Sequence, residues 1–273
     1  MIPQAFITAW RAKVPWSDDA QIEQDLVLSR ALVMLFASET IRSALALRGG
    51  TALNKLYLPT SARYSEDIDL VQIDAASIGP VIDTIRSILD PWLGEPKRST
   101  SRGNMTLVYR FESEVPPVRP LRLKVETNTR EHFTVLGFAG MRFAVENPWF
   151  VGDANVTTYQ ISELLGTKLR ALYQRRKGRD LFDLWLCNQN GLLNAADAVK
   201  CFMRYMQAEG RFISRAEFEM NLHDKSRDTE FLSDIGPLLA SHVKFDASVA
   251  LQEVRKAVIE RLPGEAWAGA NVT

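Results

Sequence analysis

The chain has 273 residues, of which 46% are hydrophobic and 24% charged, the composition of an ordinary globular protein. Lys plus Arg and Asp plus Glu both number 33, so no overall basic field marks a nucleic-acid partner, although a local basic patch stays compatible with one. Two cysteines and three scattered histidines disfavour a disulfide scaffold and a structural zinc site. Residues 1–6 lack the pattern of a signal peptide, and no apolar run is long enough for a transmembrane helix. We therefore expect a cytoplasmic protein with no membrane partner.

The first half of the chain predicts alternating helices and strands. Ser17 has the position of a helix N-cap, and residues 67–70 alternate polar and apolar side chains as a strand does. The elements predicted here are helices over 3–13, 17–35, 51–58 and 80–90, and strands over 67–73, 107–111, 121–128 and 132–143.

The second half predicts helices throughout. Thr157 and Gln160 have the spacing of a capping box, which predicts a long helix that Gly178 ends. Another helix is predicted from Leu181, and helical patterning continues from Ala195 to the end of the chain.

These elements predict an α/β fold in two domains. Residues 1–150 form a small mixed sheet with flanking helices, and residues 151–273 form a helical C-terminal domain. No Gly/Ser linker separates the two halves. We therefore expect them to pack tightly, with the functional site in the cleft between them.

Two aspartates on the strand over 67–73 are the strongest chemical feature. Successive strand residues point to opposite faces, so Asp67 and Asp69 share one face while Ile68 and Leu70 share the other. Two carboxylates on one face suit a magnesium ion that is held jointly with a substrate phosphate. A pair of exposed acids on a solvated strand would give the same pattern, and Asp-x-Asp alone is common.

A glycine pair upstream makes the metal interpretation more specific. Gly49 and Gly50 precede a predicted helix that starts at Thr51. Glycines allow the backbone to approach a triphosphate closely, and the start of a helix offers free N–H groups to an anion. A Gly-Gly-Thr turn upstream of an Asp-x-Asp strand therefore predicts a nucleotide site.

The segments GGTAL at 49–53 and RYSEDIDL at 63–70 closely resemble the AbiEii/AbiGii family of bacterial toxins, which includes the mycobacterial MenT toxins. The resemblance continues through ELLGTKLRAL at 163–172 and RDLFDL at 179–184, and it covers roughly residues 20–190. It implies a nucleotidyltransferase core of the polymerase-β type, Mg²⁺ or Mn²⁺, and a nucleoside triphosphate. Some family members transfer nucleotides to the 3′ end of tRNA and thereby block translation. The resemblance also implies a role in phage defence and a cognate antitoxin encoded nearby, and we expect a monomer.

The resemblance carries Asp67, Asp69, Lys168 and Asp183 onto this chain as functional residues, and the other site residues are predicted from the chemistry of the turn and the strands. The predicted catalytic residues are Asp67, Asp69, Lys168 and Asp183. The predicted nucleotide-binding residues are Gly49, Gly50, Thr51, Ser65 and Lys168, and the predicted metal ligands are Asp67, Asp69 and Glu126.

Lys168 can also be argued from its helix. It falls near the middle of an apolar stripe, where a lysine is costly unless it is paired. Either the lysine snorkels to cover apolar surface, or its ammonium is directed at the triphosphate. Asp183, in an apolar neighbourhood, requires a cation such as Lys168 or Arg179, although stabilisation of the helix start would also explain it. Asp180 is predicted to be an N-cap.

Glu126 is the candidate for a third metal carboxylate, which two-metal transfer commonly uses. It shares a strand face with Arg122 and Lys124, so an edge strand with a solvated polar face is an equal alternative.

Two basic sets are candidates for RNA contact, although such runs are more often solvated surface. One is the run over 168–179, and the other comprises Lys97, Arg98 and Arg102. Other functions remain open, namely nucleotidyl transfer to a protein or small molecule, a kinase reaction, or a catalytically silent binding role.

Overall fold

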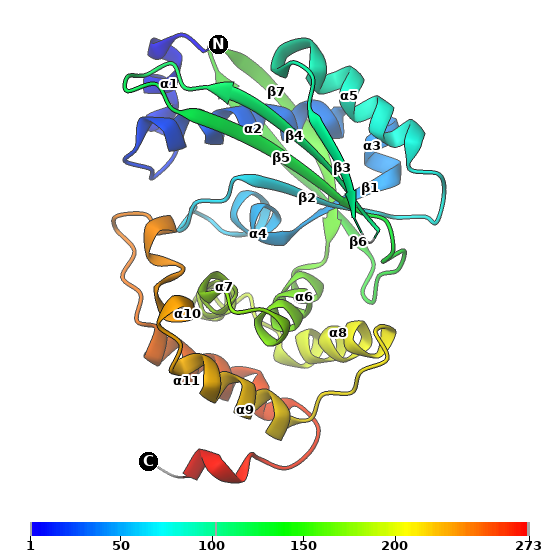
Figure 1. Cartoon of the computed structure of the whole chain (residues 1–273), viewed down its shortest axis with the longest axis vertical. Helices are drawn as coiled ribbons and strands as arrows, with labels where there is room; N and C mark the ends of the chain where they lie inside the picture. The colour runs from blue at the N-terminus through cyan, green and yellow to red at the C-terminus, as the bar shows by residue number, and fades with distance from the viewer. Residues whose placement is uncertain (1, 102, 272–273) are drawn as a thin grey trace. The chain divides into compact units, whose positions relative to one another are not determined.

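The computed structural model describes residues 2–101 and 103–271, and it divides into two compact units (Figure 1). The first unit comprises Met1–Thr134 and Phe138–Tyr159, and the second comprises Val135–Gly137 and Gln160–Thr273. Each unit has its own core.

A seven-stranded sheet forms the frame of the first unit, with strand order β3-β4-β5-β2-β1-β7-β6. Its strands are β1 (Leu45–Arg48), β2 (Asp67–Gln72), β3 (Lys97–Ser101), β4 (Asn104–Glu112), β5 (Pro120–Asn128), β6 (Phe138–Asn147) and β7 (Phe150–Tyr159). The central strand β2 pairs antiparallel with β1 and parallel with β5, so the sheet is mixed. The predicted α/β class with a mixed sheet is confirmed.

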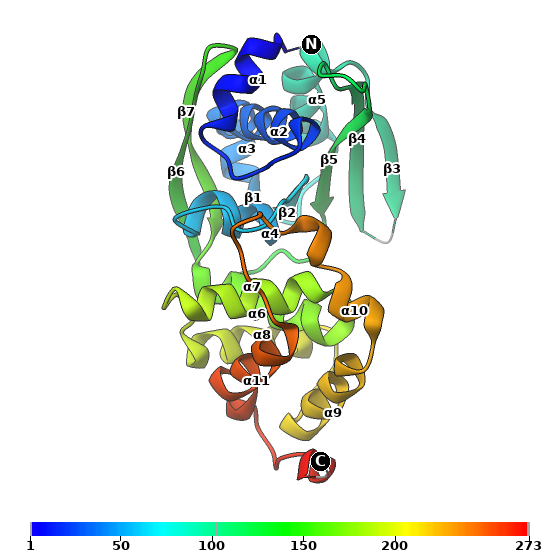
Figure 2. The same cartoon turned by 90° about the vertical axis from the view of Figure 1, so that its left-hand side faces the viewer.

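Helices cover one face of this sheet. They are α1 (Gln4–Arg11), α2 (Asp19–Ala37), α3 (Glu39–Ala44) and α5 (Gly79–Leu93), while α4 (Gly49–Ala52) continues into η1 (Leu53–Tyr57) after β1. The long helix α2 packs against β7, β5 and β6, and Figure 2 shows it between the two ends of the curved sheet. Almost every residue from Ile22 to Phe36 on α2 is buried, because the sheet curves around it.

Asp25 on α2 is a buried hub that ties three segments together. Its carboxylate accepts hydrogen bonds from the indole N–H groups of Trp10 at 2.9 Å and Trp16 at 3.1 Å. Lys55 on η1 donates to both carboxylate oxygens, at 2.8 and 2.7 Å. The helix that follows the Gly49-Gly50 turn is thereby anchored to the core of the unit.

Glu23, also on α2, is a buried carboxyl that we expect to weaken the fold at neutral pH. Its Oε2 accepts from the Glu114 backbone N–H at 2.9 Å, and its Oε1 has no hydrogen-bond partner among the described residues. Burial raises the pKa of Glu23 from 4.5 to about 7. Because the folded-state value is the higher one, ionisation removes stability as the pH rises through about 7.

Glu23→Gln keeps the acceptor and removes this ionisation. We expect the stability advantage of the variant over the wild type to grow by about 2 kcal/mol between about pH 5.5 and about pH 8. Urea unfolding at both pH values measures it. A gap that stays constant with pH would show that Glu23 is not protonated in the folded protein near neutrality.

The second unit is helical. Its helices are α6 (Ile161–Gln174), α7 (Gly178–Gln189), α8 (Ala195–Ala208), α9 (Arg215–Ser226), α10 (Thr229–Ser233) and α11 (Ala247–Ala257), with short 3-10 turns η2 (Gly236–Leu238), η3 (Ile259–Arg261) and η4 (Ala268–Asn271). Glu163 on α6 is fully buried, and it accepts from the backbone N–H groups of Val135 and Leu136, at 2.8 Å each, and from the Tyr205 hydroxyl on α8 at 2.8 Å. These bonds join the short segment 135–137 to the helical unit.

Several predicted boundaries are wrong, and the structure gives the reasons. Asp18, not Ser17, caps α2, because its carboxylate accepts the Ala20 N–H. The capping box at Thr157 does not exist, since Thr157 lies in β7 and the helix begins at Ile161 without a side-chain cap. The strand predicted over 132–143 starts only at Phe138.

The turn between α6 and α7 also differs from the prediction. Gly178 starts α7 and does not end α6, which stops at Gln174.

In the described part of the chain, no helix combines the length and the apolar character needed to cross a membrane.

Candidate active site

The two aspartates of β2 lie as the alternation predicted. Ile68 and Leu70 are buried at 0% and 1% exposure against the helices, while Asp67 and Asp69 are half-buried on the opposite face. The β-strand period thus fixes both carboxylates on one side of the sheet.

The turn after β1 lies directly against this pair. Gly49 has a positive φ of 77°, and a Cβ there would collide with Asp69 Oδ2. A Cβ at Gly50 would collide with the buried guanidinium of Arg63. Gly49 is therefore required by its backbone conformation and by its close approach to Asp69, while a side chain at Gly50 would have to displace the Arg63 guanidinium.

Thr51 holds the turn to the aspartate strand. Its hydroxyl is 2.8 Å from the Ser65 hydroxyl and donates to the Asp67 carbonyl oxygen at 2.5 Å. Thr51 is 1% exposed, so its hydroxyl fixes the register between the helix start and β2. The turn, Ser65 and Asp67 therefore form one connected group.

Lys124 on β5 is a member of the site that the sequence did not reveal. The parallel pairing places Lys124 beside Asp67 and Glu126 beside Asp69. The Lys124 ammonium lies 2.6 Å from Glu126 and 3.7 Å from Asp67. The alternation of charged residues along 122–126 was visible in the sequence, but the partner strand and its register were not.

The electrostatics of Asp67 favour a bound cation. Burial raises the pKa of Asp67 to about 6; Lys124 acts against this shift, and the negative charges of Asp69 and Glu66 add to it. Asp67 Oδ1 is buried and has no hydrogen-bond partner among the described residues. An oxygen that is buried, charged near neutral pH and unsatisfied is a suitable ligand for a hard cation.

Among the described residues, the structure does not assemble a third protein ligand for a metal ion beside Asp67 and Asp69. Within residues 2–101 and 103–271, no group of three or more His, Cys, Asp or Glu side chains is arranged to hold a metal ion. Magnesium is commonly bound through one or two carboxylates together with substrate phosphates, so Asp67 and Asp69 fit that mode. The role of Glu126, whose carboxylate is directed at Lys124, stays a prediction.

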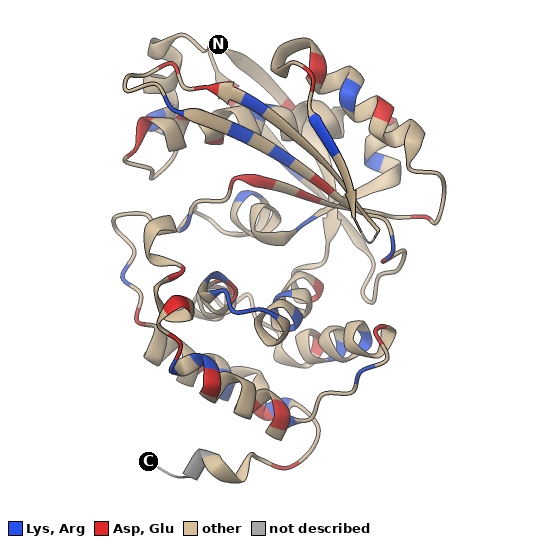
Figure 3. Cartoon of the chain, viewed as in Figure 1, with Lys and Arg blue, Asp and Glu red and all other residues tan. Residues whose placement is uncertain are grey.

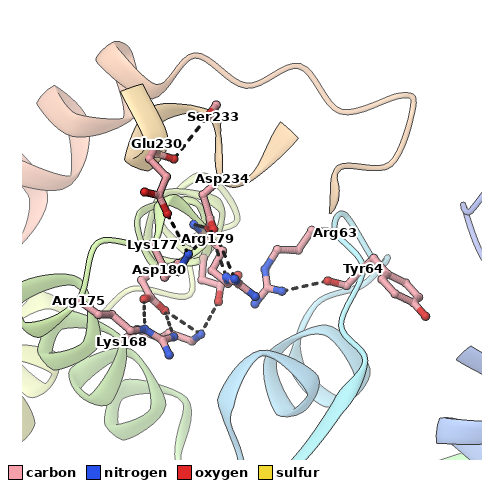
Figure 4. Close-up of polar contacts among 11 residues, drawn as sticks. Arg63, Tyr64, Lys168, Arg175, Lys177, Arg179, Asp180, Glu230, Ser233 and Asp234 are labelled. Atoms are coloured by element: carbon pink, nitrogen blue, oxygen red, sulfur yellow. Dashed lines mark hydrogen bonds and ion pairs between the residues drawn. The ribbon is translucent and has the colours of Figure 1, made fainter. Parts of the chain in front are cut away.

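Lys168 lies in the second unit within a buried charge cluster (Figure 4). Its ammonium is 2.7 Å from Asp183 and 3.2 Å from Asp180, and its side chain is 6% exposed. The expected pairing of Lys168 with Asp183 is confirmed, and the snorkelling alternative is excluded by this burial. Arg179, the other predicted partner, pairs with Asp234 at 3.2 Å.

Asp180 is not the N-cap that was predicted, because α7 begins at Gly178 with Lys177 before it. It is fully buried, and Arg175 binds it through two N–H groups at 2.6 and 2.7 Å. Burial alone would raise the pKa of Asp180, but Lys168 and Arg175 outweigh it and hold the pKa below its usual value. Asp180 is therefore the anchor that locates the lysine.

The basic run over 168–179 is neutralised within its own unit. Its ion pairs are Lys168 with Asp180 and Asp183, Arg170 with Glu209, Arg175 with Asp180, Arg176 with Asp228, Lys177 with Glu230 and Asp234, and Arg179 with Asp234. A run that contains six cations and no acid in sequence is thus close to neutral in the fold. Of the second predicted set, Arg102 lies outside the described residues.

A known family model, the nucleotidyl transferase AbiEii toxin of type IV toxin–antitoxin systems, matches residues 30–257. The chain belongs to the AbiEii nucleotidyltransferase toxin family. The match covers both units, and the family is the one that the motifs predicted. No curated protein matches the chain significantly in sequence.

Solved structures of other nucleotidyltransferases share the AbiEii fold. MenT4, a nucleotidyltransferase toxin from Mycobacterium tuberculosis, aligns over 97% of this chain and 91% of its own, at 16% identity and a TM-score of 0.64. A protein from H. pylori named as a nucleotidyltransferase aligns over 92% of this chain and 100% of its own, at 20% identity and a TM-score of 0.51. At these identities the likeness establishes the fold, and family membership establishes that the chain is a nucleotidyltransferase.

Proposed function

We propose that this AbiEii toxin transfers a nucleoside monophosphate from a nucleoside triphosphate to RNA, most specifically to the 3′ end of tRNA, and so blocks translation. The acceptor hydroxyl attacks the α-phosphorus, the bond to the β-phosphate oxygen breaks, and pyrophosphate leaves. The observation that carries the proposal is the buried, unsatisfied Oδ1 of Asp67 beside Asp69, with the Gly49 turn against Asp69.

Asp67 and Asp69 would hold magnesium. Bound there with the triphosphate, the metal would supply charge neutralisation at the phosphorus and would favour ionisation of the attacking hydroxyl. Glu126 is proposed as an additional ligand, which requires that Lys124 move from it. Lys124 otherwise offsets the charge of Asp67 and Glu126 while the metal is absent.

The Gly49-Gly50 turn is proposed to contact the triphosphate through backbone N–H groups. The helix that starts at Gly49 has no side-chain cap, so its first N–H groups are available to an anion. Thr51 and Ser65 hold this turn to β2, which keeps phosphate and metal ligands in one rigid group.

The Lys168 ammonium is proposed to neutralise charge on the triphosphate, with Asp183 supporting the lysine, in line with the family resemblance. Asp183 and Asp180 orient the ammonium from two sides, so its position does not depend on the flexible stem alone.

RNA as the acceptor is supported by the family and not by net charge, which is zero. The type IV toxin–antitoxin family also implies a cognate antitoxin.

Two radiolabelled triphosphates test the reaction and the acceptor together. We expect α-labelled but not γ-labelled nucleotide to become attached to tRNA, only with a divalent metal present. Transfer of the γ-label would instead identify a kinase. Labelling of protein without any labelling of RNA would remove RNA as the acceptor.

A further inference from the structure

The face of the sheet that bears Asp67 and Asp69 continues across three more strands of the first unit. The opposite face is covered by helices, as the hydrogen bond from Tyr109 on β4 to Asp90 on α5, 2.8 Å long, illustrates. Residues of β4 and β5 alternate between this covered face and the open one. The open face therefore extends from the Asp67–Asp69 pair to the edge strand β3.

The strand register places basic side chains in adjacent rows on this open face. One row runs from Lys97 on β3 through Val108 and Lys124 to Asp67. In the neighbouring row Arg110 on β4 lies directly opposite Arg122 on β5. With about 4.8 Å between strands, Lys97 and Asp67 are about 14 Å apart, a distance that a short stretch of single-stranded nucleic acid spans. Figure 3 shows basic positions along β3, β4 and β5 and acidic positions along β2.

The outer cations of this face are available to a partner. Lys97 and Arg110 are exposed, and among the described residues neither has an ion-pair partner. Arg122 pairs with Glu66 at 3.2 Å, but both side chains are about half exposed, so the pair is weak. In the basic run over 168–179 the exposed pairs of Arg176 with Asp228 and of Lys177 with Glu230 are weak for the same reason. Every cation of that run nevertheless has an acidic partner within the second unit, which Lys97 and Arg110 lack among the described residues.

The fold does not explain the pair Arg110–Arg122. Like charges directly opposite each other on neighbouring strands are destabilising. A lysine on an edge strand such as β3 can serve to prevent strand pairing with another molecule. Arg110 and Arg122 lie on interior strands, so that explanation does not apply to them. Glu112 is the acidic neighbour on the same face of β4, and no ion pair joins it to Arg110 in the described structure.

We propose that this open face is the acceptor track of the enzyme. The phosphates of an RNA strand lie on Lys97, Arg110 and Arg122, and the 3′ end of that strand reaches Asp67 and Asp69. The assignment rests on the proposed function, since it takes RNA to be the acceptor. It names a surface on the first unit, where the sequence had offered both the run over 168–179 and the set around Lys97.

Arg98 provides a matched control for the track. It is the next residue on β3, is exposed, has no ion-pair partner among the described residues, and is paired with Leu107 on the covered face. Arg110→Gln, the double variant Lys97→Gln with Arg110→Gln, and Arg98→Gln are compared with the wild type. Binding of fluorescently labelled tRNA is measured by anisotropy, without nucleotide, over a series of salt concentrations. Thermal melts check that all variants are folded.

We expect the salt slope of binding to fall by about 0.7 for Arg110→Gln and by about 1.4 for the double variant. If the double variant and the wild type bind equally at about 1 M salt, a slope difference of about 1.4 makes the double variant bind about 25-fold more weakly at about 0.1 M. Arg98→Gln should bind as the wild type does. The binding assay does not depend on turnover, and transfer of α-labelled nucleotide by the wild type is measured separately.

Equal binding by the double variant and the wild type would overturn the track while leaving the proposed function intact, provided that the wild type still labels RNA. Absence of both RNA binding and RNA labelling would overturn both. Loss of affinity for the purified antitoxin alone, with unchanged RNA binding, would assign this face to a protein partner and would also overturn the track.

Discussion

Asp67→Asn and Asp69→Asn are each expected to lower nucleotidyl transfer by about a thousandfold or more, because each removes a charge that holds the metal at the phosphorus. The fold should survive both changes. Burial raises the pKa of Asp67, so ionisation of this group costs stability as the pH rises through about 6. At neutral pH without metal, Asp67→Asn should therefore melt at or above the wild-type temperature.

Magnesium provides the second readout of this prediction. It should raise the melting temperature of the wild type, since a ligand that binds only the folded state stabilises it, and it should not raise that of either variant. Asp74→Asn is the matched control, because Asp74 is exposed in the loop after β2.

Expression of the wild type in a bacterial host should arrest growth, and Asp69→Asn should relieve the arrest. Unfolding of either variant would show that its carboxylate is needed for the fold. Transfer at the wild-type rate by either variant would exclude that carboxylate from the mechanism.

The local part of this site was predictable from sequence. Alternation along β2 fixes the shared face of Asp67 and Asp69, and a glycine pair before a helix fixes a tight turn. These features depend on residues that are near one another in the chain. The distance between the turn and the strand was not predictable, since it depends on Thr51 bridging to Ser65 and to the Asp67 carbonyl.

Long-range pairing was the part that sequence could not supply. The acids that neutralise the run over 168–179 include Glu209, Asp228 and Asp234, which lie tens of residues away. Lys124 likewise enters the site only through the parallel pairing of β5 with β2. A local charge count is therefore a poor guide to which cations stay available.

The missed strand β7 has a different cause. Thr157 and Gln160 satisfy the spacing of a capping box, but Val156, Thr157, Thr158 and Tyr159 are residues that favour strands. Tertiary pairing with β6 decided between two local preferences. The β-branched run was the feature that could have identified the strand.

The structure changes what is expected of Lys168. An isolated lysine on an apolar stripe would be replaced by methionine at little cost. Here its ammonium compensates the buried carboxylates of Asp183 and Asp180. We therefore expect Lys168→Met to lower the free energy of unfolding by about 3–5 kcal/mol, because it leaves buried negative charge with less compensation. Loss of activity in that single variant would not separate a structural role from a role in the reaction.

The double variant Lys168→Met with Asp183→Asn separates the two roles. It removes one charge of each sign, and Asp180 keeps Arg175 as its partner. The loss of unfolding free energy in the double variant should be smaller than the sum of the losses in the two single variants by about 2 kcal/mol. A coupling of this size is expected for residues in direct contact. If the Lys168 cation acts on the triphosphate, transfer by the double variant should stay about a hundredfold or more below the wild type although the fold has recovered.

Leu172→Ala supplies the comparison for stability alone. Leu172 is fully buried on the same helix, and its truncation should cost about 2–5 kcal/mol without removing a charge. At a temperature where every variant is folded, Leu172→Ala should transfer nucleotide at close to the wild-type rate, because a folded but weaker scaffold still presents the cation. Urea unfolding and steady-state kinetics with varied triphosphate measure both quantities for each variant. Recovery of transfer together with stability in the double variant would show that Lys168 and Asp183 serve the fold, since the reaction would then proceed without either charge.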